Sequence, residues 1–172
     1  MQRNSHVDGE YLMDHTDSSG GDSRRPSVEV AVTVIRRGSL LLAGFNHAWE
    51  AFTLPMTKRR CMERAGDSAS FDPERWADAA ARNVSEWMED SALSPPVQLM
   101  TIEGYRQSDR DLVVKEYRFE VFTTTVPDGQ PLLPDSVAEW LTPAEFRDVH
   151  RRPISPTARF LVQTLQNAGK LG

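Results

Sequence analysis

The sequence predicts a domain of the α+β or α/β class, because segments with strand-like alternation and segments with helical spacing follow one another along the chain. Residues 28–35 place Val at every second position, which is typical of a β-strand with one apolar face. Residues 71–90 repeat apolar side chains at three- and four-residue steps, as an amphipathic helix does. Thr-Pro-Ala-Glu at 142–145 is a capping box with proline at the first helical position. The predicted order is two strands, a long connection, a helix, three strands and two helices.

Size and composition favour one folded domain preceded by a polar segment. The chain has 172 residues, enough to form a sizeable core. Residues 1–26 are rich in Ser, Gly and Asp and contain too few apolar side chains to offset the entropy of ordering them. We therefore predict a disordered tail at 1–26 and a folded domain at 27–172.

Charge and cysteine content argue against several kinds of partner and site. The formal net charge of −5 provides no basic surface for nucleic acid or for an anionic membrane. The single cysteine, Cys61, excludes an intrachain disulfide and a zinc site built from several cysteines. The sequence has no apolar run of membrane-spanning length and no signal-peptide pattern. We therefore expect a cytoplasmic protein.

The first two strands are predicted to form a hairpin. Residues 28–35 are followed by a turn, Arg-Arg-Gly-Ser at 36–39, and by the apolar run 40–45. The connection at 56–70 is long for a compact domain and carries several basic residues. Connections of this length are usually functional or mobile, so this one is a candidate for ligand contacts.

The helix predicted at 71–90 begins with a recognisable signal. Asp72 can cap the first turn, and Pro73 suits the first helical position because its φ is already restricted. Its apolar stripe consists of Trp76, Ala80, Val84, Trp87 and Met88. This stripe is expected to pack on the sheet.

The same helix also carries charged residues at helical spacing. Glu86, Glu89 and Asp90 stand at three- and four-residue steps, so their carboxylates can converge on one point. A hard divalent cation is one ligand that such a cluster can hold. The alternative is a solvated, salt-bridged surface, because Asp78, Arg82 and Glu86 also follow one another at four-residue steps.

The second half of the chain is predicted to add three strands and two helices. The strands are expected at 97–105, 112–126 and 138–141. The capping box at 142–145 begins a short helix. Ser155-Pro156 begins the last helix in a similar way. The apolar face of that helix is expected to consist of Phe160, Leu161, Leu165 and Ala168.

This order of elements, with Ala-Glu-Trp-Leu at 138–141 before the Thr-Pro capping box, resembles the Nudix hydrolase family over roughly residues 27–168. The resemblance implies a mixed β-sheet sandwiched between helices. The family signature is G-x5-E-x7-R-E-U-x-E-E-x-G-U, where U is a bulky aliphatic residue. The matching residues are Glu74 at the first glutamate, Arg82 at the arginine, Val84 at the aliphatic position and Glu86 at the first glutamate of the E-E pair.

The signature is degenerate in this chain. Asn83 stands where the glutamate after the arginine is expected, Trp87 replaces the second glutamate of the pair, and Glu89 occupies the glycine position. A shifted alignment instead places Glu86, Glu89 and Asp90 at the spacing of the family's acidic ligands.

The resemblance implies a chemistry and a set of site residues. In active members, glutamates of the signature hold Mg²⁺ or Mn²⁺ ions that bridge the diphosphate of a nucleoside diphosphate linked to another group. By this resemblance the catalytic candidates are Glu86, Arg82 and Glu139. The candidate metal ligands are Glu86, Glu89 and Asp90.

Two further groups are candidates for ligand contacts. Lys58, Arg59 and Arg60 lie near the expected cleft, and guanidinium groups fit phosphate oxygens bidentately. The alternative is a solvated basic loop. Trp49 and Phe52 can stack on a base, although residues of this kind more often close one end of a core.

Three functions remain open at this point. The first is a divergent or impaired metal-dependent Nudix-type hydrolase, and the acidic trio and the basic run favour it. The second is a catalytically inactive module that binds a nucleotide-like or phosphorylated ligand, which the loss of signature carboxylates favours. The third is a protein-interaction scaffold. A small-molecule nucleotide or diphosphate is the expected partner of the first two, and the family resemblance makes a homodimer a further expectation.

Overall fold

The computed structural model describes residues 27–63, 71–89, 93–148 and 150–171. The disordered tail predicted at 1–26 and the candidate metal ligand Asp90 lie outside these residues.

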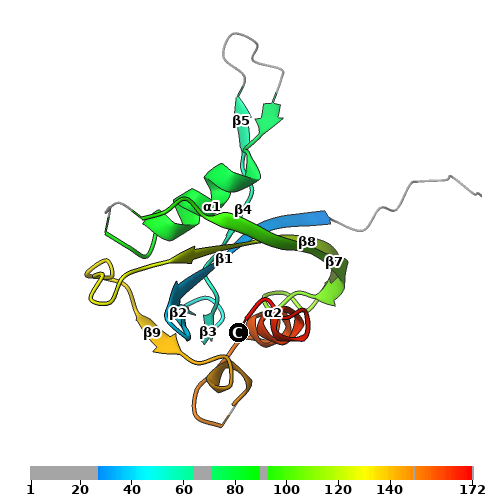
Figure 1. Cartoon of the computed structure of the whole chain (residues 1–172). Helices are drawn as coiled ribbons and strands as arrows, with labels where there is room; N and C mark the ends of the chain where they lie inside the picture. The colour runs from blue at the N-terminus through cyan, green and yellow to red at the C-terminus, as the bar shows by residue number, and fades with distance from the viewer. Residues whose placement is uncertain (1–26, 64–70, 90–92, 149, 172) are drawn as a thin grey trace, which may run out of the picture.

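The domain is built on one mixed sheet with a helix on each face (Figure 1). The strands of this sheet are β1 (Ser27–Arg37), β2 (Leu40–Asn46), β3 (Ala51–Thr53), β4 (Met56–Lys58), β7 (Val97–Gln107), β8 (Val114–Thr125) and β9 (Ala138–Leu141). Their order is β3-β2-β1-β8-β7, with β4 paired to β1 and β9 paired to β2. β1 and β8 are parallel, whereas the other pairs are antiparallel. The predicted mixed sheet between helices is confirmed.

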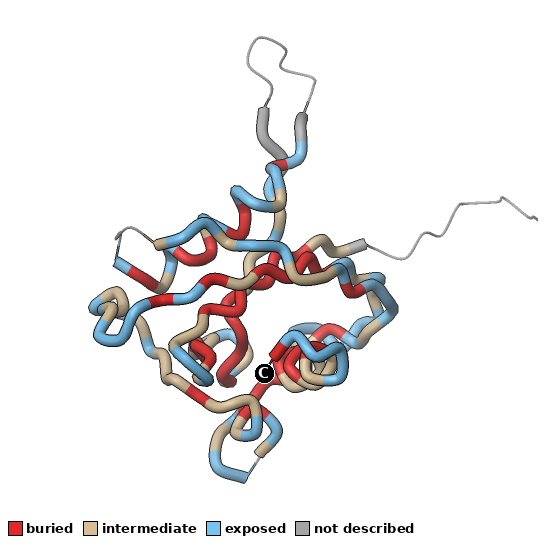
Figure 2. Tube along the Cα trace, viewed as in Figure 1, coloured by how far each residue is buried: buried red, intermediate tan, exposed pale blue. Residues whose placement is uncertain are grey.

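Helices α1 (Trp76–Ser85) and α2 (Pro156–Asn167) cover opposite faces of this sheet. On the α2 face, Val30, Val32 and Val34 of β1 join the cluster that includes Leu161 and Leu165 of α2. On the α1 face, Ile35 and Leu42 pack with Val84 and Met88. The alternation predicted for β1 therefore places its valines toward α2, and Figure 2 shows the buried residues gathered along these inner surfaces.

The predicted first hairpin is confirmed. β1 and β2 pair up to Arg37 and Leu40, which leaves Gly38 and Ser39 in the turn. Gly38 has a φ of 58°, a conformation that glycine adopts without steric cost. The strands predicted at 97–105, 112–126 and 138–141 correspond to β7, β8 and β9.

The helix predicted at 71–90 is wrong at both ends, because α1 covers only Trp76–Ser85. Asp72 and Pro73 do not begin the helix: they belong to β6 (Phe71–Pro73), which pairs with β5 (Cys61–Glu63). Here tertiary pairing overrides the local capping signal. Glu86 is the C-cap, and Met88 beyond it forms a bridge with Leu132.

The connection at 56–70 is also more regular than predicted. Its first residues form β4, where Met56 pairs with Val32 in the middle of β1. Its later part includes β5, and the β5–β6 pair projects away from the body of the domain (Figure 1). Pairing with β1 ties the start of this connection to the core.

The start predicted at Ser155-Pro156 is confirmed, whereas at 142–145 the hydrogen bonds of the capping box are present but the helix begins at Glu145 and not at Pro143. Glu145 accepts a hydrogen bond from the Thr142 backbone N–H (2.8 Å), and Thr142 Oγ1 accepts one from the Glu145 N–H (3.3 Å). The helix that follows is one 3₁₀ turn, η1 (Glu145–Arg147). In α2 the Ser155 hydroxyl accepts from the Ala158 N–H at 3.1 Å. Phe160 is only partly buried and Ala168 is exposed, so the buried face of α2 consists of Thr157, Ala158, Leu161, Val162 and Leu165.

No helix in the described part of the chain is long and apolar enough to cross a membrane.

Candidate functional site

Two of the four residues that match the signature, Glu74 and Arg82, form a bidentate ion pair. Arg82 donates from Nε to Glu74 Oε1 at 3.0 Å and from Nη2 to Glu74 Oε2 at 2.8 Å. Both side chains are largely buried. The hydrogen bonds from Arg82 are the main reason that the pKa of Glu74 lies below its ordinary value, and they outweigh the opposing effect of burial. Glu74 is therefore held as a carboxylate.

The same ion pair fastens β4 to α1. Arg82 Nη1 donates to Thr57 Oγ1 at 2.7 Å, and Arg82 Nη2 donates to the Lys58 carbonyl at 3.0 Å. Glu74 Oε2 in turn accepts from the Arg60 backbone N–H at 3.0 Å. The sequence proposed a catalytic role for Arg82, but every contact described here connects backbone segments of this fold.

Arg59 belongs to this structural network as well. Its Nε donates to the Glu74 carbonyl at 2.6 Å, and its Nη1 pairs with Glu29 Oε2 at 3.1 Å. Its guanidinium lies 4.6 Å from the centre of the Trp76 ring. Through these contacts, Arg59 links β1 and the segment after β4 to the start of α1.

The degenerate positions of the signature lie in the packing interface. Asn83 is fully buried and donates from Nδ2 to Thr33 Oγ1 of β1 at 3.2 Å. Trp87 lies against Gly44 of β2 so closely that a Cβ built on Gly44 would be 2.1 Å from the indole. These two positions therefore contribute to packing between α1 and the sheet.

Glu86, the remaining signature glutamate, is paired with a cation of its own chain. Its Oε1 lies 3.3 Å from Arg82 Nη1, and its side chain is 46% exposed. Glu89 follows after the end of α1 and is exposed. Because the helix ends at Ser85, Glu86 and Glu89 do not share the regular helix surface that the predicted cation site requires.

The described residues by themselves do not form a divalent-cation site, and Asp90, the third predicted ligand, lies outside them. Within the ranges given above, no group of three or more His, Cys, Asp or Glu side chains is arranged to hold a metal ion. Of the signature positions, one presents a buried amide, one an indole and one a carboxylate already paired with Arg82. The oxygen-rich environment that Mg²⁺ or Mn²⁺ needs is therefore not formed by these side chains.

Glu139, the other catalytic candidate, lies on the opposite face of the sheet from α1. It pairs in register with Ala43, which belongs to the α2-side cluster. Its Oε2 forms an ion pair of 2.6 Å with Arg152 Nε, in the segment before α2. The fold therefore does not bring Glu139 together with Glu86.

A cavity of about 360 Å³, here called the inner chamber, opens on the α2 face of β1, β4 and β8. Its floor is apolar and consists of Val28, Val30, Met56, Tyr117 and Phe119. The rings of Tyr117 and Phe119 are parallel, with centroids 5.2 Å apart. Five charged residues line the same chamber: the cationic Lys58, Arg110 and Lys115 and the anionic Asp109 and Asp111.

Two loops complete the inner chamber. In the first, Asn46 Oδ1 accepts from the backbone N–H groups of Ala48 (3.0 Å) and Trp49 (3.2 Å), and this turn presents Trp49 to the cavity. The second loop joins β7 to β8 and is fastened to α2, because Asp109 Oδ2 accepts from the Thr157 N–H at 3.1 Å.

The β7–β8 loop is also stabilised internally. Asp111 pairs with Lys115 and accepts from the Val113 N–H at 3.2 Å. The hydrogen bond from Lys115 is the main cause that lowers the pKa of Asp111 to about 2. Lys115 therefore faces the chamber with a carboxylate beside it.

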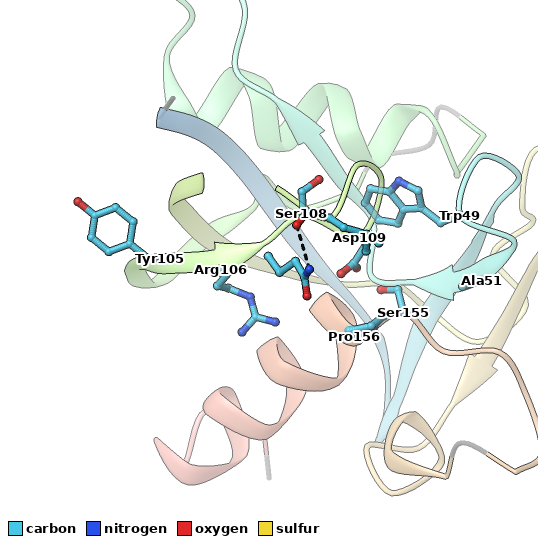
Figure 3. Close-up of a pocket in the computed structure, with 10 residues that line it drawn as sticks. Trp49, Ala51, Tyr105, Arg106, Ser108, Asp109, Ser155 and Pro156 are labelled. Carbon is cyan, nitrogen blue, oxygen red and sulfur yellow. Dashed lines mark hydrogen bonds between the residues drawn. The ribbon is translucent and has the colours of Figure 1, made fainter. Parts of the chain in front are cut away.

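A second cavity, here called the outer chamber, has a volume of about 420 Å³ and adjoins the inner one. Figure 3 shows its lining, with Trp49, Ser108 and Asp109 on the loops and Ser155 and Pro156 at the start of α2. Trp49, Ser108 and Asp109 line both chambers.

The structure separates the predicted ligand contacts into two groups. Trp49 and Lys58 line the inner chamber. Arg60 is exposed, and its backbone N–H is engaged by Glu74. Phe52 is buried in the α2-side cluster beside Phe45, with the ring centroids 5.2 Å apart, so it belongs to the core and lines neither chamber.

Sequence reasoning missed Arg110, Lys115 and Tyr117. The alternation of β8 places Lys115, Tyr117 and Phe119 on one face, which is a readable signal. The parallel register that sets Tyr117 beside Val28 connects segments far apart in the sequence, and no local pattern indicated it.

Comparisons with known proteins show what the fold resembles. A scan against protein-family models and a search of curated proteins found no match. Solved structures do match. A Nudix hydrolase from Nitrosomonas europaea has 18% identity and a TM-score of 0.55, and the match covers 85% of this chain and 92% of that one. The MutT protein of Methanosarcina mazei has 14% identity and a TM-score of 0.58, with 85% and 97% covered.

A third match is the Nudix domain of Shewanella oneidensis NrtR, solved in complex with ADP ribose. It has 14% identity and a TM-score of 0.56, and the match covers 86% of this chain and 91% of that one. Similarity at these identities shows a shared fold. The predicted Nudix-like domain is therefore confirmed at the level of the fold.

Proposed function

We propose that this Nudix-fold domain binds a nucleotide-like, phosphorylated ligand in the inner chamber and does not cleave it by the metal-assisted route of Nudix hydrolases. The observation that carries the proposal is the lining of the chamber, where an apolar, partly aromatic floor adjoins Lys58, Arg110 and Lys115. A planar base and a phosphate need these two environments side by side.

The floor suits the base. Val28 and Val30 provide an apolar surface, and the parallel rings of Tyr117 and Phe119 extend it. Trp49 adds a partly exposed indole. Aromatic faces bind a base by stacking, to which each contributes about 1–3 kcal/mol.

The cationic side chains suit the phosphates. Lys58 pairs in register with Val30 and so lies on the same face of the sheet as the floor. Lys115 precedes Tyr117 by two residues on β8 and shares that face. The two lysines therefore approach the floor from β4 and from β8, and Arg110 approaches it from the loop above.

The positions of the signature side chains support binding without cleavage. Thr57 pairs with Ala31 and contacts Arg82 on the α1 face, whereas Lys58 beside it lines the chamber on the α2 face. β4 thus lies between the Glu74–Arg82 ion pair and the chamber, and Thr57, which also lines the chamber, contacts Arg82 directly. Glu86 is bound to Arg82 and is not among the residues that line the chamber.

A structural neighbour supports a ligand of this class. The Nudix domain of NrtR shares the fold and was solved with ADP ribose bound. A phosphorylated nucleotide is therefore the first ligand class to test.

Hydrolysis is the second candidate function, and two observations favour it. Neighbours with this fold are named hydrolases, and the Glu86 carboxylate is partly exposed at the end of α1. A ligand that extends past β4 would bring its phosphates toward that carboxylate.

Calorimetry with AMP, ADP, GDP, CDP, UDP and ADP-ribose, each with Mg²⁺ and with chelator, tests the binding proposal. We expect at least one compound to bind equally well in both conditions. Lys58→Glu should weaken that binding by about tenfold or more, because it places a negative charge beside the phosphates. Lys170→Glu is the matched control, since Lys170 is exposed at the end of the chain and lines neither chamber.

Chromatography of the same mixtures tests for cleavage. Intact compounds after long incubation with Mg²⁺ or Mn²⁺ would support a binding module. Metal-dependent cleavage that Glu86→Gln removes would establish the second candidate instead. Failure of every compound to bind, with the protein folded, would reject the nucleotide proposal.

A further inference from the structure

Resting on the proposed function, we propose that the ligand carries an apolar group on its base, away from its phosphates, and that this group occupies the outer chamber. Leu112 then helps to select ligands that carry such a group. This inference follows from how the two chambers adjoin and from the different side chains that line them.

The two chambers are neighbours and share part of their lining. They share Trp49, Ser108 and Asp109, which come from the β2–β3 loop and the β7–β8 loop. The first turn of α2 lies under both, because Ser155 and Pro156 line the outer chamber and Thr157 lines the inner one. A ligand that filled only the inner chamber would leave the adjoining space to water.

The chemistry of the junction decides which end of the ligand passes through it. Lys58, Arg110 and Lys115 line the inner chamber only. The three shared side chains are an indole, a hydroxyl and a carboxylate, and the Asp109 carboxylate already accepts the Thr157 N–H of α2. Asp109 and Asp111 also line the inner chamber, but there Lys58, Arg110 and Lys115 accompany them, whereas a diphosphate at the junction would meet the Asp109 carboxylate with no cation among the shared residues. The phosphates therefore remain over the lysines, and the base end points toward the junction.

The outer chamber suits an apolar group. Trp49, Ala51, Leu112 and Pro156 form much of its wall. The cationic side chain of Arg106 also lines this chamber, but its guanidinium is stacked 3.8 Å from the centre of the Phe160 ring, and its Nε has no hydrogen-bond partner among the described residues. An apolar group that also contains one hydrogen-bond acceptor would satisfy this donor.

Leu112 has no evident role in folding. Its side chain is 68% exposed, and its φ of 57° is unfavourable for a leucine. Asparagine adopts this conformation more readily than leucine does. Leucine at this position therefore destabilises the fold slightly, but it supplies an apolar wall to the outer chamber.

Three probes test this inference by calorimetry: ADP, ADP with a hexyl group on N6, and the hexyl ester of ADP at the terminal phosphate. The last two compounds carry the same apolar group at opposite ends. We expect N6-hexyl-ADP to bind about tenfold more tightly than ADP, as partial burial of the hexyl chain implies. The phosphate ester should bind within about twofold of ADP.

Two variants on the same hairpin locate the effect. Leu112→Asn should remove most of the gain from the N6-hexyl group while ADP affinity stays unchanged, and it should not destabilise the protein. Val113→Thr is the control, since Val113 is 50% exposed on the same hairpin but lines neither chamber. It should retain the full gain.

The outcomes separate this inference from the function on which it rests. If N6-hexyl-ADP binds no more tightly than ADP, or if Leu112→Asn keeps the gain, the inference is wrong while nucleotide binding stands. Tighter binding of the phosphate ester would also overturn it, because the phosphate end would then be the one that enters the outer chamber. If no nucleotide binds at all, the proposed function itself fails.

Discussion

The segment aligned with the family signature, residues 74–89, differs between its two ends in how many signature residues it contains and in what its side chains contact. At its start, Glu74 and Arg82 match the family signature and form a buried bidentate ion pair. At its end, Asn83 and Trp87 depart from the signature and pack against β1 and β2. The residues that organise the backbone are present, whereas two of the positions that supply metal ligands in the family hold packing residues and the third keeps its glutamate, Glu86.

This difference explains how a degenerate signature can accompany an intact fold. Glu74 and Arg82 hold β4 on α1, and β4 contributes Met56 and Lys58 to the inner chamber. The chamber therefore depends on the retained residues. The replaced residues lie on the other face of the sheet, where they affect stability and not the shape of the chamber.

The largest loss of stability is expected from Arg82→Ala, which removes the cation of the Glu74–Arg82 ion pair. Among the described residues, removing Arg82 leaves the buried Glu74 carboxylate with the Arg60 backbone N–H as its hydrogen-bond partner, and breaking a buried ion pair costs about 3–5 kcal/mol in the free energy of unfolding. Arg75→Ala is the control, since Arg75 is 83% exposed and should change that free energy by less than about 0.5 kcal/mol. Chemical denaturation of both variants measures the difference, and equal stabilities would refute the structural role.

The same variant has a predictable pH dependence. Arg82 lowers the pKa of Glu74 below its ordinary value of 4.5, so the stability from this pair is present above that value and is lost as the pH falls through the lower pKa of the folded protein. In Arg82→Ala, protonation relieves the unpaired charge. The difference in the free energy of unfolding between wild type and variant should therefore decrease from pH 7 toward pH 3. A constant difference would mean that the effect is not electrostatic.

A somewhat smaller loss of stability is expected from Asn83→Glu, which places a glutamate where the family signature has one. Asn83 is fully buried beside Thr33, so the new carboxylate would be desolvated without a cation, at a cost of about 2–4 kcal/mol. Ser85→Glu, on the exposed side of α1, is the control. A stable Asn83→Glu protein that gains Mn²⁺ binding, seen by electron paramagnetic resonance, would show that this position still faces a metal site.

Gly44→Ala tests the packing of Trp87 from the opposite side. The added Cβ would lie 2.1 Å from the indole, so the ring must move, and such overpacking costs about 1–3 kcal/mol. Combining it with Trp87→Leu should cost less than the sum of the two single changes, because the smaller side chain makes room. Additive costs in thermal unfolding would show that the two residues are not in contact.

The smallest effect is expected from Glu86→Gln. The Glu86 side chain is 46% exposed and its ion pair with Arg82 is long, so the free energy of unfolding should change by less than about 0.5 kcal/mol. Thermal shift with Mn²⁺ should show no metal-dependent stabilisation of either protein. Stabilisation of the wild type alone would restore Glu86 as a metal ligand.

Local patterns predicted much of the fold and only part of the site. The alternation at 28–35 and the caps at Thr142 and Ser155 depend on neighbouring residues, and the structure has them as expected. Lys58 was proposed as part of a basic run near the expected cleft and Trp49 as an aromatic residue that can stack on a base, and both line the inner chamber. Phe52 was proposed for the same reason as Trp49, and its burial in the core shows that proximity in sequence does not determine which way a side chain points.

The sequence by itself determined the alternating strands, the capped helix starts and the loss of signature carboxylates, because each of these is set by residue type and short-range spacing. Tertiary structure alone decided where α1 begins and ends, since pairing of residues 61–63 with 71–73 displaced a valid capping signal. It also decided the chamber, whose floor requires β1 and β8 to lie in parallel register. Contacts of that kind join residues far apart in the chain, so their energy appears only when the whole sheet has formed.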